Sequence, residues 1–256
     1  TYQQVSWDPT QQKFIIRHRP AGDFTYDPQT SAWQRFTGGP FGGDVNTHGI
    51  FPYDPDVGLL TLVTASAGRG VYRLVGNTWQ SYDYPPQEAW CTPQSVYIPE
   101  LKLHLVQCLG WNPRWYKYDA INTRWTVLTG IPADAELDID SFDYDSVNKM
   151  VIAVQHHAGV QKVWAFDPAT NVWTTLPIPA IRPTRALRAD ASAPLLRYDP
   201  NNNVFIFLDP DVNTFAGSTG TWAYRYRRPS SGNPVLTVTA DNKSRAYGAA
   251  NPSFTA

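Results

Sequence analysis

A short hairpin pattern recurs along the chain and constrains the fold more than any other feature. In its fullest form, over residues 163–176, an apolar run is followed by the segment Asp167–Asn171 and then by a second apolar run around Trp173. The apolar runs suit pleated strands, and the Asp-Pro segment between them has the chemistry of a tight turn. Related hairpins are found at residues 24–33, 71–79 and 115–125. The sequence therefore predicts a repeated β-hairpin.

The spacing of the repeat indicates how the hairpins are assembled. The tryptophans of the hairpins recur at intervals of 46, 46 and 48 residues, at Trp33, Trp79, Trp125 and Trp173. A period in the forties that is made of strands is typical of propeller blades. A second motif, an aromatic residue followed by Asp-Pro or a related pair, precedes each hairpin and opens five units, beginning at Trp7, Tyr53, Tyr97, Tyr144 and Tyr198.

We therefore predict an all-β fold, a five-bladed β-propeller of four-stranded antiparallel blades with a short, extended C-terminal tail. The units span about residues 1–37, 45–83, 90–129, 139–177 and 193–228. The fifth unit has a third-strand pattern at Thr221–Tyr226, but no strand with a tryptophan follows it. Either residues 233–240 supply an edge strand or this blade is incomplete.

The best-preserved copies of the motif resemble a known family. Residues 26–33 and 166–173 both read Tyr/Phe-Asp-Pro-x-Thr-x-x-Trp. This pattern resembles that of kelch-like β-propellers, and the resemblance covers residues 1–228. It implies a propeller domain over that range.

The C-terminal residues 229–256 have a different character. A linker-like stretch rich in Pro, Ser and Gly is followed by Leu236-Thr-Val-Thr-Ala240 and, further on, by Tyr247-Gly-Ala-Ala-Asn-Pro252. In this order the two elements resemble the opening of an MBG domain, a β-rich module of large secreted bacterial proteins. The resemblance implies an incomplete MBG-like segment and an extracellular or cell-surface location.

Composition and charge exclude some functions and leave others open. A formal net charge of −1 gives no basic field for nucleic acid, and the longest apolar runs have the length of strands, so we expect no membrane span. The sequence contains no Gly-x-Ser-x-Gly, phosphate-binding glycine loop, Cys-x-x-Cys or His-Glu-x-x-His motif. No catalytic residue is assigned.

We expect the ligand site at the blade ends opposite the Asp-Pro turns, where the connections are longer and more variable. Arginines there could bind carboxylated or sulfated glycans, and tryptophans could stack on sugar rings. The alternative is that the tryptophans pack between blades and the arginines cover them. The candidates for ligand binding are Arg69, Trp111, Arg114, Trp115, Arg182, Arg185 and Arg188.

Two further groups of residues could bind a metal. Carboxylates alternate in the segment that leads to the fourth unit, at Asp134, Glu136, Asp138 and Asp140. Such a segment could supply oxygen ligands to calcium, and the alternative is a solvated acidic rim. The histidines His18, His156 and His157 end second strands and are either metal ligands or polar loop residues.

The two cysteines, Cys91 and Cys108, lie on the first hairpin of the third unit. If that hairpin turns tightly between Ile98 and Leu101, Cys91 faces Cys108 across the strands. Opposed residues of this kind lie within disulfide reach, so we predict a Cys91–Cys108 disulfide and an oxidising compartment. The alternative is two buried thiols.

These observations leave three functional hypotheses. The first is a non-catalytic recognition, adhesion or assembly module of a larger secreted bacterial protein, with a glycan or protein partner at the cell surface or in the extracellular matrix. The second is a polysaccharide-acting hydrolase or lyase that uses carboxylates between residues 134 and 145 with nearby Arg or His. The third is a cytosolic protein-interaction scaffold, which the MBG-like tail disfavours.

Overall fold

The computed structural model describes residues 3–18, 22–36, 49–50, 52–63, 70–76, 78–86, 92–109, 114–133, 139–157, 160–177, 195–209 and 220–226. All regular elements in these ranges are strands, so no helix in them is long and apolar enough to cross a bilayer. The chain forms two compact units, residues 1–137 and 138–256, which are described separately below.

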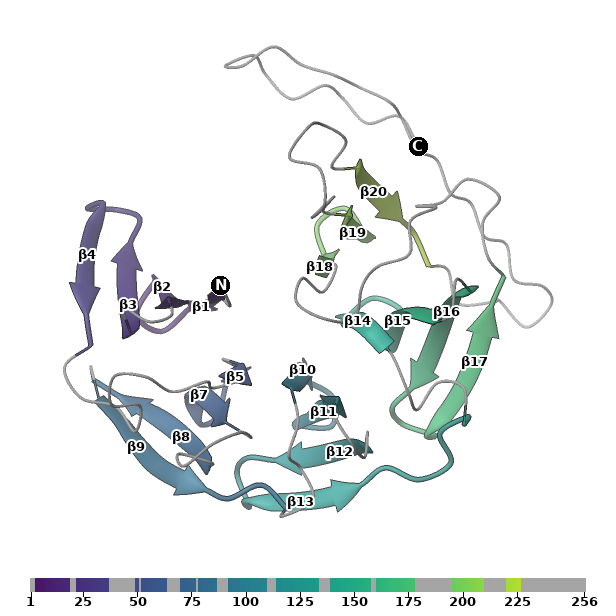
Figure 1. Cartoon of the computed structure of the whole chain (residues 1–256), viewed down its shortest axis with the longest axis horizontal. Coiled ribbons are helices and arrows are strands. Elements are labelled where there is room, and N and C mark those ends of the chain that lie inside the picture. Colours follow the sequence, from purple (N-terminus) through teal and green to yellow (C-terminus); the bar gives the residue numbers. More distant parts are fainter. Residues whose placement is uncertain are drawn as a thin grey trace, which may run out of the picture. The chain divides into compact units, whose positions relative to one another are not determined.

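The first unit contains three antiparallel sheets (Figure 1). Sheet A consists of β1 (Gln3–Asp8), β2 (Lys13–His18), β3 (Gly22–Asp27) and β4 (Ala32–Arg35). Sheet B consists of β5 (Gly49–Ile50), β6 (Tyr53–Asp54), β7 (Gly58–Val63), β8 (Gly70–Val75) and β9 (Thr78–Asp83), with β5 and β6 both paired to β7. Sheet C consists of β10 (Thr92–Ile98), β11 (Leu103–Leu109), β12 (Arg114–Asp119) and β13 (Arg124–Val127).

The second unit contains two further antiparallel sheets. Sheet D consists of β14 (Ile139–Asp145), β15 (Met150–His157), β16 (Val160–Asp167) and β17 (Val172–Leu176). Sheet E consists of β18 (Leu195–Asp199), β19 (Val204–Asp209) and β20 (Gly220–Tyr224). Apart from β6, which pairs with β7 as β5 does, the strands of each sheet follow one another in chain order. The sequence prediction of an all-β chain with five antiparallel propeller-type sheets is confirmed.

The turn aspartates determine where the hairpins reverse. An oxygen of Asp8 accepts the backbone N–H of Thr10 at 2.9 Å and that of Gln11 at 3.2 Å. The side chains at the same position of the other turns accept backbone N–H groups two or three residues ahead in the same way, and these are Asp27, Asp54, Asp119, Asp145, Asp167 and Asp199. Such side-chain-to-backbone bonds stabilise the turn locally.

The same turns share a left-handed residue just before the next strand. Seven non-glycine residues in the described ranges have positive φ, between 48° and 61°, and all of them end a hairpin turn: Gln12, Ser31, Lys102, Thr123, Lys149, Asn171 and Asn203. Gly58 has the equivalent place in sheet B, with φ 99°. The hairpins therefore use one turn geometry in spite of different sequences.

Neighbouring sheets within each unit pack through apolar faces. In the first unit Ile15 of sheet A packs with Leu59, Leu74 and Trp79 of sheet B. A second cluster joins sheets B and C, and it contains Leu60, Leu62, Val71, Val106, Cys108, Tyr116 and Tyr118. In the second unit Ile152, Val154 and Ala165 of sheet D pack with Leu196, Phe205 and Phe207 of sheet E. Burial of these side chains is the main stabilising contribution to each unit.

Candidate functional site

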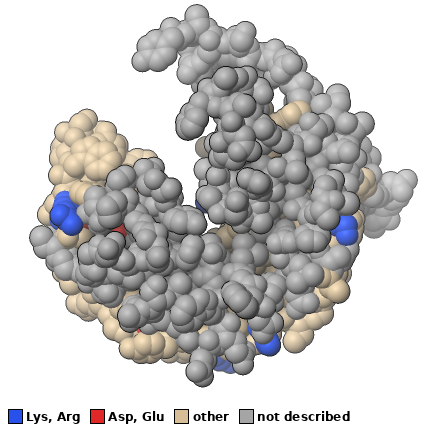
Figure 2. All heavy atoms as spheres, in the orientation of Figure 1, with Lys and Arg blue, Asp and Glu red and all other residues tan. Residues whose placement is uncertain are grey.

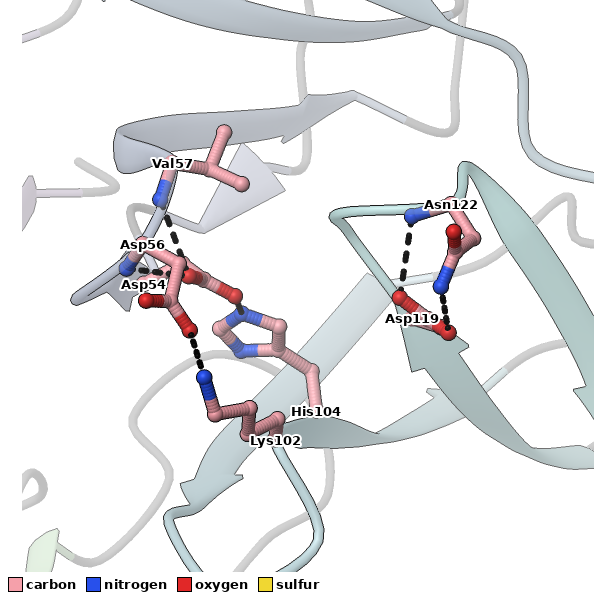
Figure 3. A network of polar contacts seen from close by, with 7 residues as sticks. All are labelled: Asp54, Asp56, Val57, Lys102, His104, Asp119 and Asn122. Carbon is pink, nitrogen blue, oxygen red and sulfur yellow. Dashed lines mark hydrogen bonds and ion pairs between the residues drawn. The ribbon is translucent and has the colours of Figure 1, made fainter.

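The most distinctive polar group of the first unit is a buried pair between sheets B and C. Nε2 of His104 lies 3.1 Å from Oδ2 of Asp54, and both side chains are 1% exposed (Figure 3). Asp54 is held there by its own turn, because its other oxygen accepts the N–H groups of Asp56 and Val57. One carboxylate therefore caps a turn of sheet B and binds a side chain of sheet C.

The position of His104 in its sheet explains why it is buried. It is the second residue of β11 and lies opposite Tyr97 of β10. The same register position in the other sheets is apolar, being Phe14, Leu59, Val151 and Phe205. His104 thus replaces a core residue, and a buried imidazole without a partner would be destabilising. Asp54 supplies the partner.

Aromatic rings surround this pair. The ring centroid of His104 lies 5.0 Å from that of Tyr97 and 6.2 Å from that of Tyr118. Burial, with the charges of Asp54 and Asp56, raises the pKa of Tyr97 to about 12. Nδ1 of His104 is buried without a hydrogen-bond partner among the described residues. Aromatic rings therefore border the imidazole of His104, and its hydrogen-bond partner among the described residues is Asp54.

The charge state of Asp54 follows from its contacts. Burial alone would raise the pKa of its carboxyl, but the hydrogen bonds from His104 and from the N–H groups of Asp56 and Val57 outweigh burial and lower that pKa below its usual 3.8. The carboxylate form is therefore favoured, with its hydrogen-bonding capacity already used. Such a group is suited to fixing structure and not to exchanging protons with a substrate.

A second, exposed ion pair lies beside the buried one. Nζ of Lys102 lies 3.0 Å from Oδ2 of Asp56, with the two side chains 61% and 41% exposed. Figure 3 shows this pair next to His104, and a further turn of sheet C in which Asp119 accepts two bonds from Asn122. Exposed pairs of this kind contribute little to stability.

Tryptophan N–H groups also link sheets of the first unit. Nε1 of Trp79 donates to Oδ2 of Asp23 at 2.9 Å, which joins sheets B and A. Nε1 of Trp125 donates to Oδ2 of Asp83 at 3.0 Å, which joins sheets C and B. These two hairpin tryptophans are therefore used to pack the sheets together.

In the second unit, β14 and β18 are joined by side-chain oxygens of β14. Oγ of Ser141 accepts the N–H of Leu196 at 3.1 Å, and Oδ2 of Asp143 accepts the N–H of Tyr198 at 2.9 Å. Burial raises the pKa of Asp143, opposed by the N–H of Tyr198 and the charge of Arg197. The carboxylate of Asp145 caps its own turn. The two described carboxylates of the 134–145 segment that were candidates for catalysis thus bind backbone N–H groups.

The described part of the chain contains few of the predicted ligand-binding residues. Trp115 is fully buried, which favours packing over stacking on a sugar, and Arg114 begins the same strand with a partly exposed side chain. The other five candidates lie outside the described residues, and these are Arg69, Trp111, Arg182, Arg185 and Arg188. Only Trp115 and Arg114 are therefore placed by the described residues, and the ligand-binding set stays a prediction.

The predicted metal ligands are described only in part. Asp134, Glu136 and Asp138 lie outside the described residues, and for Asp140, His18, His156 and His157 only the backbone is described. Among the described residues no group of three or more His, Cys, Asp or Glu side chains is placed to hold a metal ion. The calcium site stays a prediction.

The register of sheet C corrects the arithmetic behind the predicted disulfide. Ile98 pairs with Leu103 and not with Leu101, and Cys108 lies opposite Pro93. The prediction assumed a tight two-residue turn, whereas four residues with Lys102 in the left-handed region separate the strands. No described cysteine is free, but Cys91 lies outside the described residues, so the pairing itself stays a prediction.

The described charges are scattered. Figure 2 shows the described Lys and Arg of the face in view as small, separate blue areas among tan residues. Those positions that are exposed on the sheets include Arg35, Arg73 and Arg124.

Comparisons with known proteins identify the fold and no family. No protein-family model and no curated protein matches the chain. Among solved structures, TolB from Acinetobacter baumannii is similar with a TM-score of 0.57 and 18% identity, over 87% of this chain and 51% of that one. A GH74 xyloglucanase from Xanthomonas campestris is similar with a TM-score of 0.57 and 15% identity, over 88% of this chain and 37% of that one.

A protein from Lactobacillus plantarum has a TM-score of 0.59 and 16% identity, over 91% of this chain and 69% of that one. The chain spans about half of the TolB structure and just over a third of the xyloglucanase. At these identities the likeness shows a common fold and carries no function with it.

Proposed function

We propose that the chain is a non-catalytic recognition, adhesion or assembly module of a larger secreted bacterial protein. Its partner would be a glycan or a protein at the cell surface or in the extracellular matrix. Binding would use the connections at the sheet ends opposite the Asp turns. The single observation that carries the proposal is that the described carboxylates accept hydrogen bonds from groups of the fold itself.

At the turn ends of the sheets, these carboxylates are already committed to the fold. Seven turn aspartates accept backbone N–H groups, and Asp54 also holds the buried His104. Ser141 and Asp143 accept N–H groups of β18. A carboxylate that is fixed by two donors is a poor general acid or nucleophile, which favours a scaffold over an enzyme at these positions.

The opposite sheet ends carry the connections that differ most from unit to unit. Their sequences contain Arg69, Trp111 and the triplet Arg182, Arg185 and Arg188. Guanidinium groups bind carboxylate and sulfate bidentately, so an acidic glycan or an acidic protein surface suits this set. Variable connections on a rigid scaffold are a common place for binding.

The MBG-like tail and the predicted disulfide support the secreted setting. The tail resembles a module of large secreted bacterial proteins, and a disulfide would require an oxidising compartment. The similarity in fold to TolB agrees with such a module and does not decide its location.

A glycan array combined with a panel of extracellular-matrix proteins tests the proposal. Arg182, Arg185 and Arg188 would be replaced by alanine together. A matched control would replace the exposed Arg35, Arg73 and Arg124, which removes the same charge from the sheets. We expect binding by the wild type and the control, and at least about a tenfold loss in the loop variant. Equal binding by all three proteins, or none by the wild type, would contradict the proposal.

Action on a polysaccharide is the second candidate function, and it is favoured by the carboxylates that alternate between residues 134 and 145. Release of reducing ends, or of unsaturated products in the case of a lyase, from xyloglucan and acidic polysaccharides would detect it. The enzyme would be favoured if the wild type is active, if Asp143→Asn keeps that activity, and if replacement of a carboxylate between residues 134 and 140 removes it.

A further inference from the structure

One face of sheet A is aromatic on all four of its strands. Cross-strand pairing places four rings in a row across the sheet, and these are Trp7, Phe14, Tyr26 and Trp33. Successive ring centroids lie 4.9, 6.4 and 4.8 Å apart. Because side chains alternate between the two faces of a strand, a second row on the same face consists of Val5, Ile16 and Phe24. We call these two rows the aromatic face.

The aromatic face is exposed, whereas the same face of the other sheets is buried. Trp33 is 61% exposed, Val5 59% and Trp7 40%. Phe14 is partly exposed, and the side chains at its register position in the other sheets are at most 2% exposed, namely Leu59, His104, Val151 and Phe205. A contiguous exposed apolar surface of this kind marks an interaction site.

The cover of the same face in other sheets indicates which kind of partner the aromatic face fits. In the first unit Leu59 and Trp79 of sheet B pack on Ile15 of sheet A. The corresponding faces of sheets C and E pack in the same way on aliphatic side chains of sheets B and D. In each case the cover is another protein sheet, so the aromatic face has the chemistry of a sheet-packing surface.

The inclination of the rings favours a protein partner over a sugar. Along the row, successive ring planes are inclined to one another by 59°, 27° and 37°. A sugar stacks on a flat aromatic surface, whereas inclined rings suit the edge-to-face contacts that aromatic side chains make with one another. A second aromatic face can supply such contacts.

The charge of the aromatic face suits contact with a copy of itself. Among the described charged side chains of sheet A, Asp8, Lys13, Asp23 and Asp27 alternate onto the other face, and Arg35 has a position on this one. Arg35 is exposed and ends the edge strand β4, so it lies at the border of the face. An isologous contact brings a patch against its own copy. It would therefore join apolar side chains and leave this charge at the rim.

The exposed area has the size that a dimer interface needs. Since a large aromatic side chain buries about 150–250 Å², the exposed fractions leave roughly 300–500 Å² of apolar surface in solvent. A standard interface buries about 800 Å² per partner, of which about 65% is apolar in homodimers. The aromatic face would supply most of that apolar area.

We propose that the aromatic face of sheet A is a dimer interface, in which it packs against the same face of a second copy of the chain. The row of four rings lies at the Asp-turn end of the sheet, because Trp7 and Tyr26 directly precede turn aspartates. The opposite sheet ends stay free in both copies. The dimer would then carry two ligand sites and bind a repetitive glycan or matrix with avidity, and this last step alone rests on the proposed function.

Sedimentation velocity of the full chain over a wide concentration range tests the proposal. We expect the wild type to sediment as a dimer. Trp33→Glu places a charge in the face and should weaken dimerisation at least about tenfold. Val172→Glu is the matched control, because Val172 is 53% exposed on the fourth strand of sheet D, and it should leave the dimer intact. Near-UV circular dichroism reports whether each variant is folded.

A second variant and a second measurement keep the result independent of folding defects. Val5→Glu, on the other edge strand of the same face, should also weaken the dimer. Hydroxyl-radical footprinting should show slow oxidation of Trp7 and Trp33 in the dimer and faster oxidation after dilution. Neither measurement involves a ligand, so this proposal and the proposed function fail separately.

Three results would overturn the proposal. A monomer with rapidly oxidised Trp7 and Trp33 would mean that the face stays uncovered. A monomer in which both indoles are protected would mean that the chain itself covers the face. A dimer that Trp33→Glu and Val172→Glu affect equally would mean that the copies meet through another surface.

Discussion

Asp54 and His104 come from different sheets and meet through a 3.1 Å contact between side chains that are each 1% exposed. In the other sheets the position of His104 is apolar, so the pair is a local exception within a repeated scaffold. Buried polar pairs of this kind favour one arrangement of neighbouring elements, because any other arrangement leaves a polar group unsatisfied. The pair therefore specifies how sheets B and C pack.

The first prediction concerns removal of one partner. His104→Phe introduces the residue found at this position in sheets A and E and should lower the free energy of unfolding by about 1–3 kcal/mol, because Oδ2 of Asp54 loses its donor. Asp54→Ala should cost about 3–5 kcal/mol, because it also frees the N–H groups of Asp56 and Val57. Urea unfolding measures both values.

The exposed neighbour provides a control. Lys102→Ala removes an ion pair with Asp56 and should change the free energy of unfolding by less than about 1 kcal/mol. If His104→Phe were as neutral as Lys102→Ala, the buried pair would not stabilise the packing of sheets B and C.

The second prediction concerns acid. The pKa of Asp54 is lowered against the effect of burial, and the pKa of Asp199 is lowered chiefly by its bond to Asn202. A carboxyl with a lowered folded-state pKa stabilises the fold above its unfolded-state pKa and loses that contribution as the pH falls through its folded-state pKa. The free energy of unfolding should therefore fall on acidification below about pH 5.

Denaturant titrations between pH 7 and pH 2.5 check this expectation. Asp199→Asn retains an oxygen for the N–H groups of Asn201 and Asn202 but does not titrate. It should show a shallower loss of stability over the acid range than the wild type. Identical slopes would show that this turn makes no contribution.

The third prediction concerns turn geometry. Thr123 is β-branched and has φ 48°, while Asn171 and Asn203 have the same turn position with φ 61° and 50°. Asparagine tolerates the left-handed region better than threonine does. Thr123→Asn should therefore stabilise the protein by about 0.5–1 kcal/mol, and Asn171→Thr should destabilise it by a similar amount. Thermal unfolding should show a higher Tm for Thr123→Asn and a lower Tm for Asn171→Thr, and shifts of Tm in the same direction would contradict the prediction.

The fourth prediction concerns the cysteines. Cys91 and Cys108 should form a disulfide, which non-reducing peptide mapping of the protein purified from its native source detects. Since the closed loop is short, reduction should lower the free energy of unfolding by about 3 kcal/mol. The control is Cys91→Ser, which should remove the response to reductant. Two thiols that react freely with an alkylating agent in the folded protein would contradict both the pairing and the oxidising compartment.

Much of the fold could be predicted because the same hairpin pattern recurs several times in the sequence. The aromatic runs and Asp-Pro segments indicate where the hairpins lie, and the apolar run predicted around Trp173 is β17. The register of sheet C could not be predicted in this way, because Ile98 stands where the other first hairpins have the turn aspartate. Without that marker the sequence does not indicate that four residues separate the two strands.

The Asp54–His104 pair was missed for a different reason. Its members are 50 residues apart, and each has an ordinary local context: a turn aspartate and a polar residue early in a strand. Aligning the five units would have revealed the signal, because His104 is the polar residue in a column of apolar ones. The contact itself depends on how sheets pack, which no local pattern encodes.

The bonds from Ser141 and Asp143 to β18 have a consequence for how the second unit opens. If sheet E separates from sheet D, these two side-chain oxygens lose the N–H groups of Leu196 and Tyr198 together, and the apolar faces become exposed at the same time. Partial opening is thus penalised at several points at once. Sheets D and E should behave as one cooperative folding unit, in which the slowest-exchanging amides of both sheets share a single opening free energy.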